Sequence, residues 1–70
     1  MKASLSPGSL CQIVPSRGIA PLWSVPGVEF ESNLSADDLV LVVSVTDGYY
    51  VYAVVDGQVG HVAIDYLEKA

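Results

Sequence analysis

The chain has 70 residues, of which 51% are apolar and 16% are charged, and its formal net charge is −5. This length is enough for one small domain, and the composition is too apolar for a disordered chain. Eight acidic residues against three basic ones exclude the basic patch that binding to nucleic acid or to an anionic membrane surface requires.

Nothing in the sequence predicts a membrane span or a secretory signal. The longest aliphatic run, LVLVV, is far shorter than the roughly 20 residues that cross a bilayer. The first residues, MKASLSPGSL, lack the apolar core of a signal peptide, and the single Cys11 cannot form an internal disulfide. These features predict a soluble cytoplasmic protein with one domain over residues 1–70, in which residues 1–6 form a flexible tail.

Proline and glycine punctuate the first half of the chain, which excludes long helices. The segment SLCQIV, residues 9–14, predicts a first strand, although its alternation does not decide whether Cys11 or Leu10 faces inward. Residues 15–33 show no stable period and are interpreted as a long loop held by apolar side chains, which include Trp23.

A stronger pattern follows the polar turn SADD at residues 35–38. The segment LVLVVSV, residues 39–45, predicts a strand, and its uniformly apolar odd positions predict the inward face: Leu39, Leu41, Val43 and Val45. The opposite face, with Val40 and Val42, is then expected to be covered by the long loop or by a partner.

Two Asp-Gly pairs predict hairpins between the later strands. Asp56-Gly57 fits a tight two-residue turn, whereas Asp47-Gly48 fits a longer loop that begins near Thr46. The expected strands are residues 39–45, 49–55 and 58–63, followed by a short turn at AIDYL and a brief last strand at residues 67–69. The predicted fold is all-β, a small five-stranded barrel with a long first connection.

From residue 34 onward, the segment LSADDLVLVVSVTDGYYVYAVVDGQVGHVAIDYL resembles the second half of a Src homology 3 domain or of its bacterial relatives. The series Gly57, Gly60, Val62, Tyr66 and Leu67 carries the resemblance, which covers about half of the chain. The resemblance implies an SH3-like barrel with a long first loop and a short 3-10 turn before the last strand.

The resemblance also implies a groove for a peptide. The paired aromatic residues of the family correspond to Tyr49 and Tyr50, and its late tyrosine corresponds to Tyr66. Ala63 stands where the family has a groove proline, and the aromatic-acidic ALYDY motif of the first half is missing. These departures bear on whether proline-rich peptides are bound.

The tyrosines between the Asp-Gly pairs are candidates for a binding surface. Alternation places Val51 and Ala53 in the core and Tyr50 and Tyr52 on the outer face, with Tyr49 near the loop rim. Tyrosines also form purely structural cross-strand pairs, so this pattern does not by itself decide between the two roles. The predicted partner-binding residues are Trp23, Tyr49, Tyr50, Tyr52 and Tyr66.

No catalytic or metal-binding pattern is present in the sequence. His61 has no second histidine beside it, and a nucleophilic pair of Cys11 with His61 lacks an oxyanion motif. Asp37 and Asp38 are adjacent on a turn, where their carboxylates diverge and nothing buries them. The expectation is therefore a protein with no enzymatic activity, cofactor or metal.

Two functions remain. The first is a protein-interaction domain that binds a peptide or protein partner through its aromatic surface. The second is a structural or assembly subunit, with weak self-association or docking of a barrel face on a larger complex, as in small phage and bacterial proteins. The sequence names neither the partner nor the binding face.

Overall fold

The computed structural model describes residues 5–46 and 48–70 of the chain. This part contains seven strands and one 3-10 helix: β1 (Leu10–Ile13), β2 (Ile19–Val25), β3 (Glu29–Ser35), β4 (Leu39–Val45), β5 (Tyr50–Val55), β6 (Gln58–Ala63), η1 (Ile64–Tyr66) and β7 (Leu67–Lys69). The prediction of an all-β fold is confirmed.

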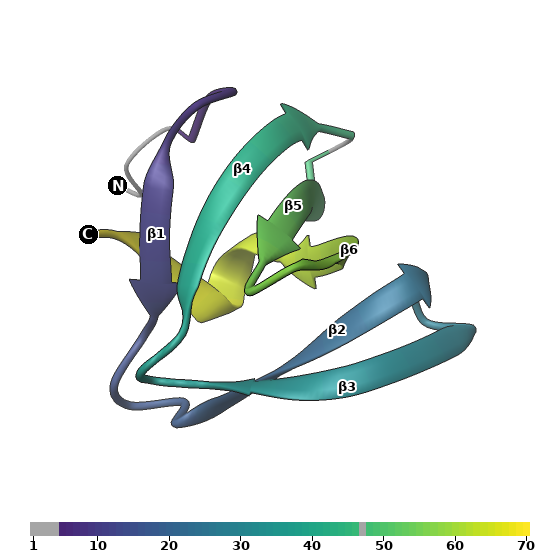
Figure 1. Cartoon of the computed structure of the whole chain (residues 1–70), viewed down its shortest axis with the longest axis horizontal. Coiled ribbons are helices and arrows are strands. Elements are labelled where there is room, and N and C mark those ends of the chain that lie inside the picture. The colour runs from purple at the N-terminus through teal and green to yellow at the C-terminus, as the bar shows by residue number, and fades with distance from the viewer. Residues whose placement is uncertain (1–4, 47) are drawn as a thin grey trace.

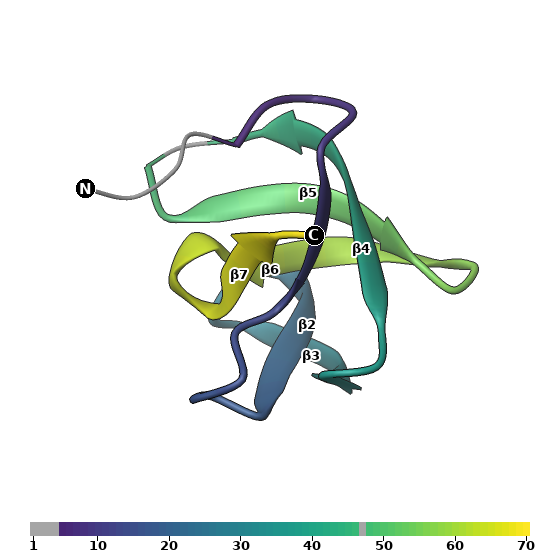
Figure 2. The ribbon, with the colours of Figure 1, turned by 90° about the vertical axis from the view of Figure 1, so that its left-hand side faces the viewer.

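The strands form one antiparallel sheet in the order β3-β2-β6-β5-β4-β1-β7. The sheet is strongly curved, with β1, β4 and β5 on one side and the β2–β3 hairpin on another (Figure 1). After a quarter turn, β7 and the C-terminus lie against β1 (Figure 2). Because β3 and β7 are the two edges and do not pair with each other, the sheet is open and has seven strands rather than five.

The second half of the chain has the predicted elements. Asp56 and Gly57 have φ values of 49° and 80°, as a tight turn between β5 and β6 requires. Between β4 and β5 the loop is longer, and the Thr46 amide and hydroxyl both donate to the Tyr50 carbonyl, at 3.2 and 2.9 Å. Asp47 lies outside the described residues. The bounds of β6 and β7 match the expectation, and η1 lies within the segment AIDYL that is expected to form a short turn.

The predicted loop over residues 15–33 is wrong, because β2 and β3 form a hairpin there. Its turn is VPGV, in which the Val28 amide donates to the Val25 carbonyl at 2.9 Å and Gly27 has a φ of 73°. Pro21 is tolerated within β2 because this strand pairs with β6 only at Trp23, so one side of the strand is unpaired at the proline.

The predicted inward face of β4 is also wrong. Val40 and Val42 are buried, at 0% and 1% exposure, whereas Leu39 and Leu41 are 57% and 40% exposed. Val43 is exposed as well, and Val45, which lies opposite the buried Val51 beyond a bulge, is 42% exposed. Period-two alternation cannot choose between two apolar faces, and the choice is made by pairing with the neighbouring strands, as Cys11 lies opposite Val40.

The core lies on the inner side of the curved sheet and draws on every strand. The buried side chains of the described residues are all apolar: Cys11, Ile13, Ala20, Leu22, Leu34, Val40, Val42, Val51, Ala53, Val55, Val62 and Leu67. Val51 and Ala53 are therefore in the core, as predicted. Leu5, in the segment expected to be a tail, packs against this core.

Candidate protein-binding surface

The outer face of the sheet carries a row of aliphatic side chains across four strands. Leu10 on β1 lies opposite Leu41 on β4, which lies opposite Val54 on β5, which lies opposite Val59 on β6. Residues that are partners in an antiparallel pair have their side chains on the same face. Leu10 and Val59 at the ends of the row are 51% and 53% exposed.

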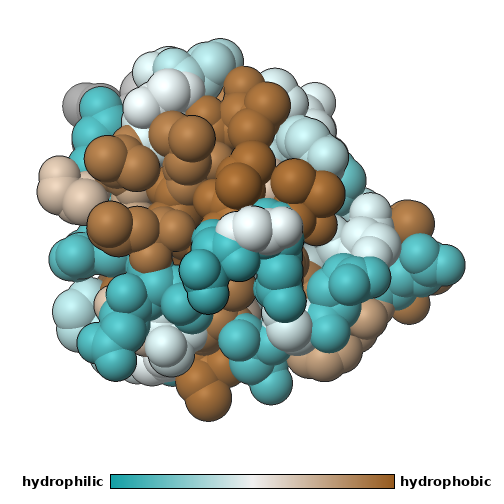
Figure 3. Space-filling model, in the orientation of Figure 1, coloured by the Kyte–Doolittle hydropathy of each residue, from teal (hydrophilic) through white to brown (hydrophobic). Residues whose placement is uncertain are grey.

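Two further residues of β4 extend this row. Leu39 precedes Leu41 on the same face, and Val43 follows it at a bulge between Val42 and Ser44. Together these side chains form what we call the apolar face: Leu10, Leu39, Leu41, Val43, Val54 and Val59. A continuous hydrophobic patch covers β1 and β4 from outside, with hydrophilic surface where β4 begins (Figure 3). A patch of this kind on a small domain is typical of a docking surface.

A second row on the outer face is aromatic. Trp23 on β2 lies opposite both Phe30 on β3 and His61 on β6, and His61 lies opposite Tyr52 on β5. The Trp23 and Phe30 rings meet edge to face with their centroids 5.9 Å apart, and the centroids of the Tyr52 and His61 rings are 5.1 Å apart. We call these four residues the aromatic row. Tyr52 and Val54, two positions apart on β5, place the two rows side by side.

His61 is enclosed within the aromatic row. Its Nδ1 atom is buried and has no hydrogen-bond partner. It is separated from Cys11, because Cys11 lies in the core while His61 lies on the outer face of the sheet. The structure therefore holds no Cys11–His61 pair, and neither residue has the arrangement of an activated nucleophile.

The five predicted binding residues fall into two groups, three on the face of the aromatic row and two, Tyr49 and Tyr66, beside or on η1. Trp23 and Tyr52 belong to the aromatic row, and Tyr50 extends it along the same face of β5, opposite Ala63. Tyr49 is 77% exposed just before β5, and its carbonyl accepts a hydrogen bond from the Ile64 amide at 2.8 Å. This bond ties Tyr49 to η1.

Tyr66 lies on η1 and is half-buried against the core. The guanidinium of Arg17 lies over the Tyr66 ring, 4.8 Å from its centroid. A cation–π contact at such a position contributes about 0.5–1 kcal/mol. Tyr66 therefore has a structural partner of its own and is not part of the aromatic row.

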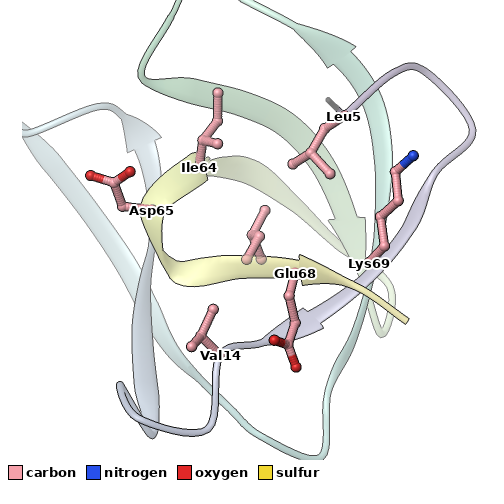
Figure 4. A pocket seen from close by; sticks show the side chains of 7 residues that line it. Leu5, Val14, Ile64, Asp65, Glu68 and Lys69 are labelled. Atoms are coloured by element: carbon pink, nitrogen blue, oxygen red, sulfur yellow. The ribbon is translucent and has the colours of Figure 1, made fainter. Parts of the chain in front are cut away.

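A pocket of about 280 Å³ lies beside η1 and β7 (Figure 4). Its lining is aliphatic with three charged side chains: Leu5, Val14, Ile64, Leu67, Asp65, Glu68 and Lys69. The Glu68 carboxylate accepts a hydrogen bond from the side-chain amide of Gln12 at 2.9 Å. Neither Cys11 nor any of the five predicted binding residues is among the residues that line the pocket.

Other polar side chains close turns or connect strands, as Ser32 on β3 donates to the side chain of Gln58 on β6. The Asp38 carboxylate accepts a hydrogen bond from the Ser35 amide at 2.8 Å, which closes the turn before β4. Over residues 5–46 and 48–70, no three acidic, histidine or cysteine side chains gather as metal ligands. The same residues include no helix with the length and apolar character of a membrane span.

The Cys11 thiol should react slowly in the folded protein. Burial raises the pKa of this thiol, and the charge of Lys69 opposes the rise only in part. Because the unfolded thiol ionises at a lower pH than the folded one, this group should lower the stability of the fold as pH rises past about 8.5.

Urea unfolding of the wild type and of Cys11→Ala at about pH 7 and pH 9 would test this prediction. The wild type should lose more free energy of unfolding over this interval than the variant. Equal losses would contradict the assigned effect of burial.

Two parts of the outer surface are missed by sequence reasoning. Phe30 lies within the segment expected to be a loop, although the Pro26-Gly27 pair between two valines is a hairpin signal that would place it on a strand. The apolar face is missed because its β4 residues are predicted to face inward.

Comparison of the chain with protein-family models, with curated proteins and with solved structures gives no match.

Proposed function

We propose that the chain is a non-enzymatic protein-interaction domain with an SH3-like fold, which binds an extended peptide across its aromatic row. The observation that carries this proposal is the row itself. Its four rings come from four strands and lie on one face, and the terminal ring, Phe30, is 53% exposed. Aromatic residues of this kind dominate the energetics of protein interfaces.

The order of the elements supports the SH3-like part of the proposal. A long first excursion, here the β2–β3 hairpin, precedes a meander of β4, β5 and β6. A 3-10 turn at residues 64–66 then leads into the last strand. These are the features that the resemblance in the second half of the sequence implies.

The chemistry of the aromatic row favours a polyproline-type or otherwise extended ligand. On a sheet face the backbone groups are already paired with neighbouring strands, so a bound peptide gains no ladder hydrogen bonds there. A polyproline helix needs none, because its backbone is solvated and its rings or apolar side chains dock between aromatic ridges. The row spans four strands at about 4.8 Å each, enough for about five residues of such a peptide.

Titration of the labelled protein with a set of proline-rich peptides would test the proposal. Saturable amide shifts should cluster at Trp23, Tyr50, Tyr52 and Phe30. Phe30→Ala should weaken binding about tenfold, because it removes a partly exposed ring of the row.

Val28→Ala provides the matched control. Val28 is 76% exposed in the turn of the same hairpin and lies outside the row. It should leave the affinity unchanged. If no peptide gives saturable shifts, or if Val28→Ala weakens binding as much as Phe30→Ala, the aromatic row is not a peptide site.

A further inference from the structure

We propose that the apolar face is a second docking site, whose occupant is an amphipathic helix with basic residues beside its apolar stripe. The site is distinct from the proposed peptide site, since it uses aliphatic side chains of β1, β4, β5 and β6 and needs no ring of the aromatic row.

The site favours a helix because it is a face of the sheet and not an edge. The strands beneath the apolar face pair on both sides, β4 with β1 and β5, and β5 with β4 and β6. A partner therefore finds apolar side chains but no backbone groups to bond. An α-helix suits such a surface, because its backbone hydrogen bonds are internal and all of its side chains point outward. Covering a sheet face with a helix is also a common way to bury such a surface.

The charges around the apolar face select a basic partner. Asp37 and Asp38 immediately precede Leu39, and Asp56 lies in the turn that connects the ends of β5 and β6 beside the row. Glu68 pairs in register with Gln12, which in turn lies opposite Leu39. One border of the face is therefore acidic. Lysine or arginine beside the apolar stripe of a helix would complement it.

No basic group of the described residues lies on the apolar face. Arg17 lies over the Tyr66 ring, and Lys69 is opposite Cys11 on β7 and lines the pocket beside η1. A second copy of the chain would bring a net charge of −5 against another of −5. If it docked through its own apolar face, its residues 5–46 and 48–70 would offer no cation on that face to this border. The charge pattern therefore favours a different, basic partner over self-association.

The test uses two helical peptides with the same leucine stripe. One peptide has lysine at all positions outside the stripe, and the other has glutamate at those positions. Titration into the labelled protein should give saturable shifts at Leu10, Leu41, Val54 and Val59 with the lysine peptide. The glutamate peptide should bind at least tenfold more weakly. A failure here with intact proline-peptide binding would remove this site and leave the proposed function standing.

Variants of the chain locate the binding site. Leu41→Ser, within the row, and as a second choice Leu10→Ser, at its end, should each weaken binding of the lysine peptide about tenfold, since both side chains are partly exposed on the apolar face. Val28→Ser, on the far hairpin turn, should leave the affinity unchanged. Asp56→Asn with Glu68→Gln, which keeps side-chain size, should weaken binding severalfold and reduce its dependence on salt.

Three results would overturn the proposal. The first is equal binding of the two peptides, which would mean that the acidic border selects nothing. The second is a set of shifts away from the apolar face, or none at all. The third is a dimer in sedimentation measurements that Leu41→Ser converts to monomer, which would identify a second copy as the occupant.

Discussion

Gly60→Ala should lower the free energy of unfolding by about 1–3 kcal/mol, a large share of the total for a domain of this size. A Cβ atom at Gly60 would lie 2.8 Å from the Trp23 carbonyl oxygen and 2.9 Å from a methyl group of Leu22. The carbonyl belongs to the backbone of β2, so relief of the clash requires β2 to move away from β6. The only register pair that joins these strands is Trp23 with His61.

Urea unfolding followed by Trp23 fluorescence would measure this loss, with Gly48→Ala as the control. Gly48 has open space around the position of a Cβ atom and no left-handed φ, so its replacement should change stability by less than about 0.5 kcal/mol. Gly60→Ala should also weaken the proposed binding of a peptide at the aromatic row, because the clash displaces Trp23. Equal stability of the two variants would mean that β2 does not approach β6 as closely as described.

The second half of the fold could be predicted because its signals are local. Asp56-Gly57 determines a turn that only a few backbone conformations satisfy, and the strands on either side have β-branched and aromatic residues. The inward positions of Val51 and Ala53 follow, since their outward neighbours are tyrosines. Here composition differs between the two faces of the strand, and alternation alone gives the orientation.

The β2–β3 hairpin could not be recognised from periodicity. Bulges interrupt the register at Trp23, so the alternation of the two strands is out of phase across the hairpin. Pro21 also argues against a strand unless one of its sides is known to be unpaired, and that depends on tertiary structure. The aromatic row combines residues from both halves of the chain, which is why only its Tyr52 and Trp23 members were predicted.

The prediction of which face of β4 points inward is wrong for a different reason. Both faces of LVLVV are apolar, and over residues 39–45 the odd positions are uniformly apolar whereas the even positions end in Ser44, which favours the odd positions as the core face. The interior of the curved sheet instead accepts the valines at 40 and 42 opposite the small side chains of Cys11 and Ala53. Close packing at the neighbouring strands decides the register, and this information is not contained in a single strand.

Replacing Val42 and Val43 in turn by aspartate would test that orientation directly. Val42→Asp places a carboxylate where the wild-type side chain is 1% exposed, and should cost about 4 kcal/mol or more. The total free energy of unfolding of a domain of 70 residues is about 4–10 kcal/mol, so this variant should be largely or wholly unfolded. Val43→Asp, at 42% exposure, should remain folded and lose less than about 1 kcal/mol.

Circular dichroism and the amide spectrum of the two variants give the result without a ligand. The comparison is closely matched, because the two residues are identical in chemistry, adjacent in sequence and separated only by the face of β4 on which they lie. The opposite outcome, with Val43→Asp unfolded and Val42→Asp folded, would restore the odd positions to the core. It would also remove the apolar face, because Leu39, Leu41 and Val43 would then face inward and could not contact a partner.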